Sequence, residues 1–406
     1  MSERNYKMTK LACYSAYFTM SSIFCLPPLL FVIFHESYGI SWTLLGTLVL
    51  TNFCTQLAVD LIFTLFSKRF NVALVVRVMP IITATGMLIY ALSPLLFPNA
   101  VYVGLLIGTV IFSVSAGLSE VLLSPLIAAI PSKNPQRDMS LLHSLYAFGV
   151  FFVVVVGTLS LKLVGEENWQ YVTAFFALLP VIAAVLFMLS PMPDMSGGES
   201  GSTRKGGDKR NYIGIALCAL CIFLGSCAEN VMSNWISSFM DAHLGIDKAL
   251  GDIIGVAAFA ILLGITRISY AKWGKHIEKM LLVGMIGSAV CYLVAGLVTS
   301  VAVAAVACVL TGVFVAMLWP GTLILMEEKI PGVGVAAFAL MAASGDLGAS
   351  VAPQLMGIIA DNAGLDTGML VTAIFPTLGT ILILVIIRFF GRKKDCPSLK
   401  LTESES

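Results

Sequence analysis

One carboxyl group lies in the middle of a long apolar stretch, at Glu120 in the sequence GLSEVLLSP. On a helix, Gly117, Glu120 and Ser124 would share one face, because they are three and four residues apart. An ionisable group in such a stretch needs a cavity or a partner, since placing it at the centre of a membrane-spanning helix costs about 2.5–3.5 kcal/mol. A carboxyl group in an apolar cavity is suited to carry a proton or to bind a polar solute. We therefore expect Glu120 to do one or both; the alternative is a structural hydrogen bond to a neighbouring helix.

A second concentration of polar groups lies between residues 229 and 237. It combines a carboxyl group, amides, hydroxyls and an indole, at Glu229, Asn230, Ser233, Asn234, Trp235 and Ser237. On a helix, the side chains at 229, 233 and 237 form one stripe and the two asparagines widen it. Such groups hold polyhydroxylated or otherwise polar solutes. We expect Glu229, Asn230 and Asn234 to bind a solute; the alternative is polar packing between helices, with Trp235 as an interface anchor.

Four further ionisable residues interrupt apolar stretches: Asp60, His143, Arg267 and Asp346. We expect them to serve in proton coupling or in gating. Each also has a plainer interpretation. Asp60 and Arg267 fit structural charges paired with another helix, and His143 fits hydrogen-bonded packing on a face that it shares with Tyr146. Asp346 stands in the sequence SGDLGAS, whose small residues allow close helix approach.

Two aromatic residues are candidate solute contacts. Tyr17 shares a helical face with Tyr14 and Ser21, ahead of Pro27-Pro28, which should break or kink the helix. Trp319 begins the sequence Trp-Pro-Gly, where a similar break is expected, and its indole is suited to stack on a ligand ring or simply to pack.

Several functional classes find no support. The sequence has no phosphate-binding G-x-x-x-x-G-K-[ST] motif, no His, Cys and carboxylate cluster with metal-ligand spacing, and no Ser–His–Asp arrangement. Its nine cysteines lie mostly in apolar stretches and are expected to be free. We therefore expect neither an enzyme nor a protein that holds a metal or another cofactor.

The elements that carry these residues are expected to be membrane-spanning helices. Apolar residues make up 58% of the chain, charged residues 12%, and the mean hydropathy is +0.94. A spanning helix needs about 20 mainly apolar residues. Twelve such stretches are present: 11–34, 42–66, 73–96, 101–130, 139–163, 169–190, 212–240, 250–271, 279–299, 302–326, 334–360 and 367–390. Because residues 1–10 are polar and the first stretch is too long for a signal-peptide core, we expect it to remain in the mature protein.

The chain divides into two halves. Residues 191–210 are rich in Gly, Ser, Pro and charge, which predicts a flexible linker between a six-helix half at 1–190 and another at 211–394. The halves also resemble each other. For example, Ile130-Pro131 recurs 200 residues later as Ile330-Pro331, and Val172-Thr173-Ala174 recurs 199 residues later as Val371-Thr372-Ala373. This predicts a pseudo-symmetric repeat, as in many transporters. The polar tail 395–406 is expected to be disordered.

The distribution of basic residues predicts the orientation in the membrane. With the N-terminus in the cytoplasm, twenty Lys and Arg residues fall on the cytoplasmic side, whereas only Lys162 and Lys248 fall outside. This asymmetry places both termini and the linker in the cytoplasm of a multi-pass cell-membrane protein. The basic clusters are explained by topology, so no nucleic-acid partner is expected. The expected partners are lipid, a small solute and protons, and the chain is expected to be a monomer.

Together these features resemble the major facilitator superfamily, over about residues 8–392. The acid of the fourth span and the polar seventh span, with Glu229, Asn230 and Trp235, resemble its fucose-permease-like branch of sugar transporters. In this superfamily spans 1, 4, 7 and 10 line a central cavity. The resemblance thus implies that the cavity is lined by Tyr17, Glu120, Asn230, Asn234 and Trp319. The superfamily's loop signature between spans 2 and 3 is degenerate here, because Lys68 stands where that signature has Asp.

The resulting expectation is a secondary active transporter that moves a small polar solute, with a sugar as one candidate, by alternating access coupled to protons. Glu120 is the leading proton carrier. One alternative is an efflux pump for amphipathic compounds, whose adaptable cavity would suit the 18 Met and 24 Phe residues. The other is a membrane receptor that binds a solute without transporting it.

Overall fold

The computed structural model describes residues 6–66, 69–132, 135–193, 209–273, 275–330 and 335–391, and the regular elements in these ranges are helices. The first half holds α1 (Lys7–Leu29), α2 (Phe31–Tyr38), α3 (Trp42–Phe66), α4 (Val72–Ala91), α5 (Ser93–Leu96), α6 (Val101–Ala129), α7 (Pro135–Val164), η2 (Glu166–Asn168), α8 (Trp169–Phe176) and α9 (Leu178–Leu189). The second half holds α10 (Lys209–Ser238), η3 (Phe239–His243), α11 (Lys248–Gly251), η4 (Asp252–Ala257), α12 (Ala258–Trp273), α13 (Ile277–Leu297), α14 (Val301–Val315), α15 (Leu318–Lys329), α16 (Val335–Ala363), α17 (Leu365–Thr372) and α18 (Ile374–Gly391).

The helices match the expected spans. Each of the twelve predicted stretches coincides with one helix or with consecutive helices. Within the described ranges, nine helical segments are long and apolar enough to cross a membrane, and the bent pair α1–α2 makes a tenth. Large apolar side chains remain exposed on the outer helices, for example Leu163, Ile268 and Leu297. Such a surface fits lipid, in which apolar side chains need no cover.

Two spans are broken close to prolines. Pro27 and Pro28 lie in the last turn of α1, and α1 and α2 meet at a bend of 42°. The second break differs from its predicted place: it lies at residues 316 and 317, between α14 and α15, so that Pro320 falls in the first turn of α15. Proline is tolerated in a first turn because no intrahelical bond needs its missing N–H.

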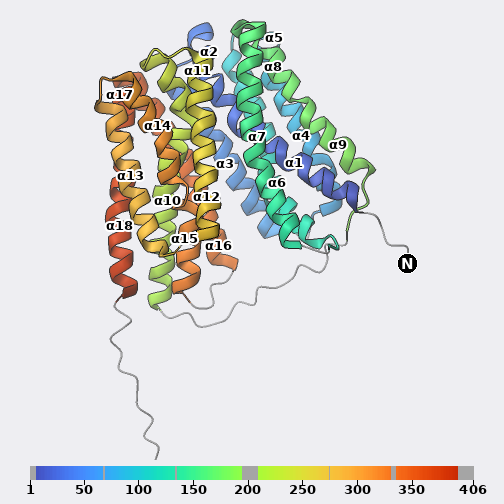
Figure 1. Ribbon diagram of the computed structural model, residues 1–406. Coiled ribbons are helices and arrows are strands. Elements are labelled where there is room, and N and C mark those ends of the chain that lie inside the picture. The colour runs from blue at the N-terminus through green and yellow to red at the C-terminus, as the bar shows by residue number, and fades with distance from the viewer. Residues whose placement is uncertain are drawn as a thin grey trace, which may run out of the picture.

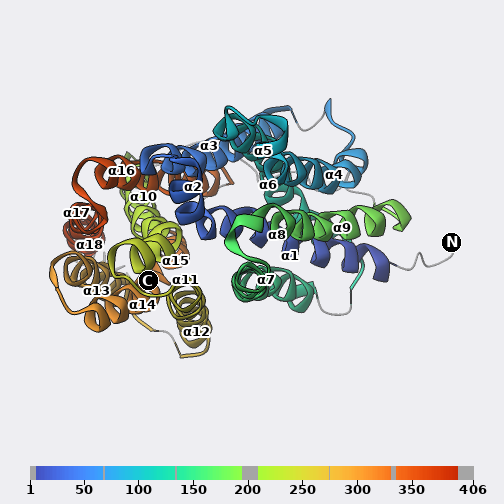
Figure 2. The ribbon, with the colours of Figure 1, turned by 90° about the horizontal axis from the view of Figure 1, so that it is seen from above.

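The two halves form separate bundles that touch along a few helices. In Figure 2, α1–α9 lie on one side and α10–α18 on the other. The halves pack together mainly through α3 and α16, with further contacts between α7 and η4 and between α1 and α10. The linker and the tail were predicted to lack regular structure. Residues 194–208 of the linker and the whole tail 395–406 lie outside the described ranges, so these two predictions stay predictions.

The halves are joined at one end and diverge at the other (Figure 1). We call the end with α2, α11 and α17 the closed end, and the end where α9 finishes and α10 begins the linker end. Along α3, Leu45 and Leu48 near the closed end are buried, whereas Leu61, Ile62 and Phe66 near the linker end are exposed. Within the described residues, every hydrogen bond and ion pair between the halves lies at the closed end. The described contacts therefore hold the halves together at the closed end and not at the linker end.

Candidate functional site

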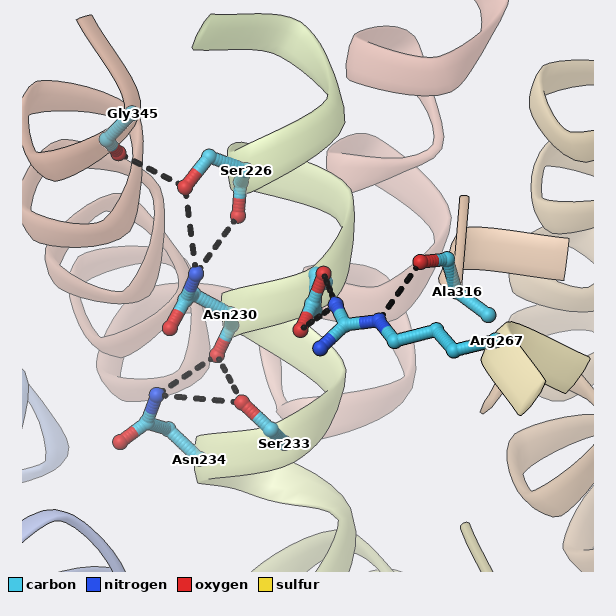
Figure 3. A network of polar contacts seen from close by, with 8 residues as sticks. Ser226, Asn230, Ser233, Asn234, Arg267, Ala316 and Gly345 are labelled. Atoms are coloured by element: carbon cyan, nitrogen blue, oxygen red, sulfur yellow. Dashed lines mark hydrogen bonds and ion pairs between the residues drawn. The ribbon is translucent and has the colours of Figure 1, made fainter. Parts of the chain in front are cut away.

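An intramembrane ion pair stands at the centre of the C-terminal half. Arg267 of α12 donates through Nη2 to both carboxylate oxygens of Glu229 on α10, at 3.2 Å each. Its Nε donates to the carbonyl oxygen of Ala316 at 2.8 Å (Figure 3). The side chains remain accessible, with 40% of Arg267 and 22% of Glu229 exposed. Because the guanidinium of Arg267 is bonded both to Glu229 and to Ala316, its orientation is fixed.

The local sequence explains why the carbonyl of Ala316 is free to accept this bond. In an unbroken helix it would accept from the N–H of residue 320. That residue is Pro320, which has no N–H. Arg267 thus satisfies an acceptor that the proline leaves open, and it links spans 7, 8 and 10 of one half. The sequence contained this signal, but it could not show which donor would arrive.

A ladder of polar side chains runs along the neighbouring face of α10 (Figure 3). Ser226 donates to the carbonyl of Gly345 on α16 at 2.7 Å, and Asn230 Nδ2 donates to the carbonyl of Ser226 at 3.0 Å. Asn234 Nδ2 donates in turn to the carbonyl of Asn230 at 2.8 Å. Because these amide hydrogens are used within the helix, the amide oxygens are the groups left to contact a solute. The polar face of α10 therefore offers mainly acceptors.

The N-terminal half contributes a carboxyl group and two tyrosines. Glu120 on α6 is exposed, and it makes no hydrogen bond or ion pair with the residues that the structure describes. The rings of Tyr17 and Tyr146 meet edge to face, with centroids 6.5 Å apart. Tyr146 is close enough to Glu120 and to Glu229 to interact electrostatically with both. The sequence did not single out Tyr146 as a site residue, because its only signal is a helical face shared with His143.

Two more carboxylates lie near Glu120. Asp60 of α3 is held against α6, where a methyl group added at Gly117 would be 3.1 Å from Asp60 Oδ1. That oxygen is buried and has no hydrogen-bond partner among the described residues. Asp346 of α16 interacts electrostatically with both Glu120 and Asp60. Three carboxylates from the two halves thus converge, and none of them is paired with a basic residue of the described chain.

Several predicted contacts take other positions. Trp235 is fully buried and its Nε1 donates to the carbonyl of Pro353 at 3.1 Å, so its indole belongs to the packing between helices rather than to a solute site. Ser237 leaves the predicted stripe because it donates to Asp252. Trp319 is half-buried, with its indole nitrogen close to Gly345. The backbone of His143 lies in α7, but its side chain lies outside the described part of the chain.

Asp60 also differs from its plainer interpretation. It has no pairing with another helix in the described residues, whereas Arg267 is paired with Glu229 of α10. Among the residues that the structure describes, no three His, Cys, Asp or Glu side chains are grouped to hold a metal ion. The eight cysteines in these ranges are free, as expected.

This architecture, two helical bundles around a polar centre, is that of a membrane transporter. A sequence profile of the Major Facilitator Superfamily matches residues 12–276 and 218–403, which together span nearly the whole chain. The chain belongs to this superfamily. It is a multi-pass membrane protein of a transporter family rather than of an enzyme family.

Solved structures share the fold at low sequence identity. The inward-open xylose transporter XylE from E. coli aligns with a TM-score of 0.73 and 15% identity, over 94% of this chain and 95% of that one. The nucleoside transporter NupG gives 0.71 and 14%, over 94% and 99%. FucP, the E. coli fucose:proton symporter, gives 0.60 and 15% in its outward conformation, over 95% and 99%. A search of curated proteins returned no match.

Proposed function

We propose that this protein is a proton-coupled secondary transporter that moves a small polar solute by alternating access. One observation carries the proposal: Glu120 of one half is exposed and unpaired in the described chain, the Glu229–Arg267 pair of the other half is also accessible, and Tyr146 interacts electrostatically with both carboxyl groups. Ionisable groups in a membrane bundle mark solute and proton pathways. A site built from both halves is reached from one side and then the other as the halves rock.

The residues take complementary roles in this proposal. Glu120 carries the proton, because it is exposed and has no competing partner in the described chain. Asn230 and Asn234 accept hydrogen bonds from the solute, while Glu229 and Arg267 fix its polar end. Tyr17 and Trp319 supply aromatic walls. Asp60, His143 and Asp346 are proposed to couple or gate the movement.

The proposed solute class is a donor-rich compound such as a sugar. The amide oxygens and carboxylates of the site are acceptors, and hydroxyl groups of a sugar would meet them as donors. The likeness to a xylose transporter and to a fucose:proton symporter supports this choice, as does the resemblance of spans 4 and 7 to the fucose-permease-like branch. The proposed placement is the cell membrane, with both termini in the cytoplasm and the linker end facing inward, and the proposed state is a monomer.

The test is counterflow in proteoliposomes with a panel of labelled sugars, polyols and small metabolites, with and without an imposed pH gradient. We expect one solute class to exchange, and a gradient that is acidic outside to drive its accumulation. Exchange without any response to the gradient would reject proton coupling. Silence across the panel, together with pH-driven extrusion of amphipathic dyes, would replace the proposal with efflux. Binding without flux would replace it with a receptor.

A further inference from the structure

The closed end contains a helix cap that crosses from one half to the other. Asp361, in the last turn of α16, accepts from the backbone N–H of Trp42 through Oδ1 at 2.8 Å and from that of Thr43 through Oδ2 at 2.7 Å. These two residues begin α3 in the opposite half. Ser41, just before them, uses its hydroxyl oxygen to accept the N–H of Leu44 at 3.3 Å. The free N–H groups of a helix start need such acceptors, and α3 takes two of them from the other bundle.

The surrounding contacts hold the two helices close enough for this cap. A methyl group added at Gly46 would lie 3.0 Å from the carbonyl oxygen of Pro353, so the glycine allows the backbones to approach. Gln354 Nε2 donates to the carbonyl of Thr43 at 3.3 Å. Trp235 packs its ring against Trp42, with centroids 5.8 Å apart. The cap is therefore the polar part of a tight junction between α3 and α16.

A second aspartate of the C-terminal half makes a similar contact with α7. Asp252, at the start of η4, accepts from Thr158 Oγ1 at 3.1 Å across the junction of the halves. Within its own half it accepts from Ser237 and pairs with Lys248 at 3.3 Å. Only 1% of Asp252 and 8% of Lys248 is exposed. The charge is thus neutralised inside one half, and the bond from Thr158 is the part that joins the two.

We propose that Asp361 and Asp252 form a latch that holds the closed end shut, with Asp361 as its stronger member. The proposal rests on alternating access, in which the closed end must also open. Opening would part α3 from α16 and leave the N–H groups of Trp42 and Thr43 without their acceptor. Because these bonds exist in only one of the two orientations, they bias the equilibrium between orientations rather than stabilising both equally.

The choice of Asp361 over the other polar contacts follows from bond type. Its two bonds join a full negative charge to the start of a helix, where the helix dipole adds to the attraction. Thr158 contributes one neutral hydroxyl. The remaining ionic contact at this junction of the described chain, Lys162 with Asp247 at 3.9 Å, is long and well exposed, and such pairs contribute little. Loss of a helix cap alone is worth about a fivefold change in an equilibrium.

Distances between spin labels test the latch without any solute. One pair of cysteines replaces Glu167 and Ser300, which are exposed at the closed end, and a second pair replaces Pro131 and Lys275 at the linker end. Cys54, which is exposed, and Cys396, which lies outside the described ranges, are first replaced by Ser; the other cysteines are buried or half-buried. We expect Asp361→Ala to lengthen the closed-end distance and shorten the linker-end distance in a population that rises about fivefold. Asp361→Asn keeps an acceptor and should give a smaller shift.

Matched variants make the outcome decisive. Asp366→Ala removes a carboxylate at the same end that bonds to no residue of the other half in the described ranges, and it should leave both distances unchanged. Thr158→Val should shift them in the same direction as Asp361→Ala, by less. Equal distances in folded Asp361→Ala and Asp366→Ala would overturn the latch. A shift in distances without counterflow would keep the latch and reject the proposed solute transport, so the two failures are distinguishable.

Discussion

Arg267 and Glu229 form a two-bonded ion pair inside the membrane-spanning bundle, and both belong to the C-terminal half. The pair therefore remains intact when the two halves move against each other as bodies. Glu120 lies in the other half and has no such partner in the described chain. Glu120 and Glu229 are thus in different electrostatic situations, which is the arrangement expected when one holds a solute and the other exchanges a proton.

The first prediction concerns the stability of this pair. Arg267→Met leaves Glu229 without its partner, and we expect the free energy of unfolding to fall by about 1–3 kcal/mol, less than for a fully buried pair because water reaches both groups. Adding Glu229→Gln should recover most of the loss. Thermal unfolding in detergent measures both effects. Lys162→Met, which removes the long and well-exposed pair with Asp247, is the control and should change little.

The spans were predictable from the sequence because the bilayer demands long apolar stretches. The bend at Pro27 and Pro28 was predictable for a similar reason, since proline disrupts helix bonding wherever it occurs. The position of the second break was not, because Pro320 is compatible with a first turn as well as with a break. These features depend on residues close together in the chain, and they need no knowledge of packing.

The partners of the polar residues were not predictable, because they depend on long-range packing. The sequence placed Glu229 and Arg267 in neighbouring spans without indicating that they meet across 38 positions. Asp361 fell one residue beyond the predicted span 334–360, where it resembles an ordinary loop charge, and its partner Trp42 is 319 residues away. The roles proposed for Glu120, Asp60 and Asp346 stay predictions.

The second prediction concerns proton coupling. Glu120→Gln keeps the size and hydrogen bonding of the side chain but cannot release a proton. We expect it to abolish accumulation driven by a pH gradient while exchange of solute at equal pH continues in part. Uptake into proteoliposomes measures both activities. Asp366→Asn, far from the cavity, should behave as the unaltered protein, and full gradient-driven accumulation by Glu120→Gln would remove Glu120 from the mechanism.

The third prediction concerns the origin of the orientation of Arg267. Pro320→Ala supplies an N–H that can bond to the carbonyl of Ala316 and displace Arg267 from it. Loss of one bond from a charged donor costs about 1.5–3 kcal/mol, so we expect solute affinity to fall about tenfold or more. Equilibrium binding or counterflow gives the affinity. Pro125→Ala, in α6, is the matched control; equal affinities in the two variants would show that the proline does not act through Arg267.

The fourth prediction concerns pH at the closed end. Partial burial raises the pKa of Asp361, but the bonds from Thr43 and Trp42 outweigh this and hold the pKa below its usual range. After opening, the carboxyl group returns to a pKa of about 4. Its contribution to the closed state is therefore complete above about pH 4 and is lost as the pH falls through that value toward the lowered pKa.

Label distances at the closed end should consequently not depend on Asp361 between about pH 8 and pH 5. Ionisable groups near the closed end include Asp366 on α17 and His35 and Glu36 on α2, where His35 stacks on Trp42 with ring centroids 4.1 Å apart. His35→Gln separates the contribution of that ring. If the closed end instead opens within this pH range, in the His35→Gln variant as well but not in Asp361→Asn, that result would contradict the predicted pH dependence of Asp361.

The fifth prediction concerns the glycines that let α3 and α16 approach. At Gly357 a methyl group would overlap the backbone carbonyl of Trp42, whereas at Gly264 it would meet nothing within 4 Å. We expect Gly357→Ala to force the helices apart, weaken the cap at Asp361 and raise the population with an open closed end. Gly264→Ala should instead stabilise α12 by about 0.5–1 kcal/mol, because alanine favours a helix over glycine. Spin-label distances and thermal unfolding distinguish the two variants. If the closed end stays shut in Gly357→Ala, then α3 and α16 can move apart without releasing the latch, and the prediction is wrong.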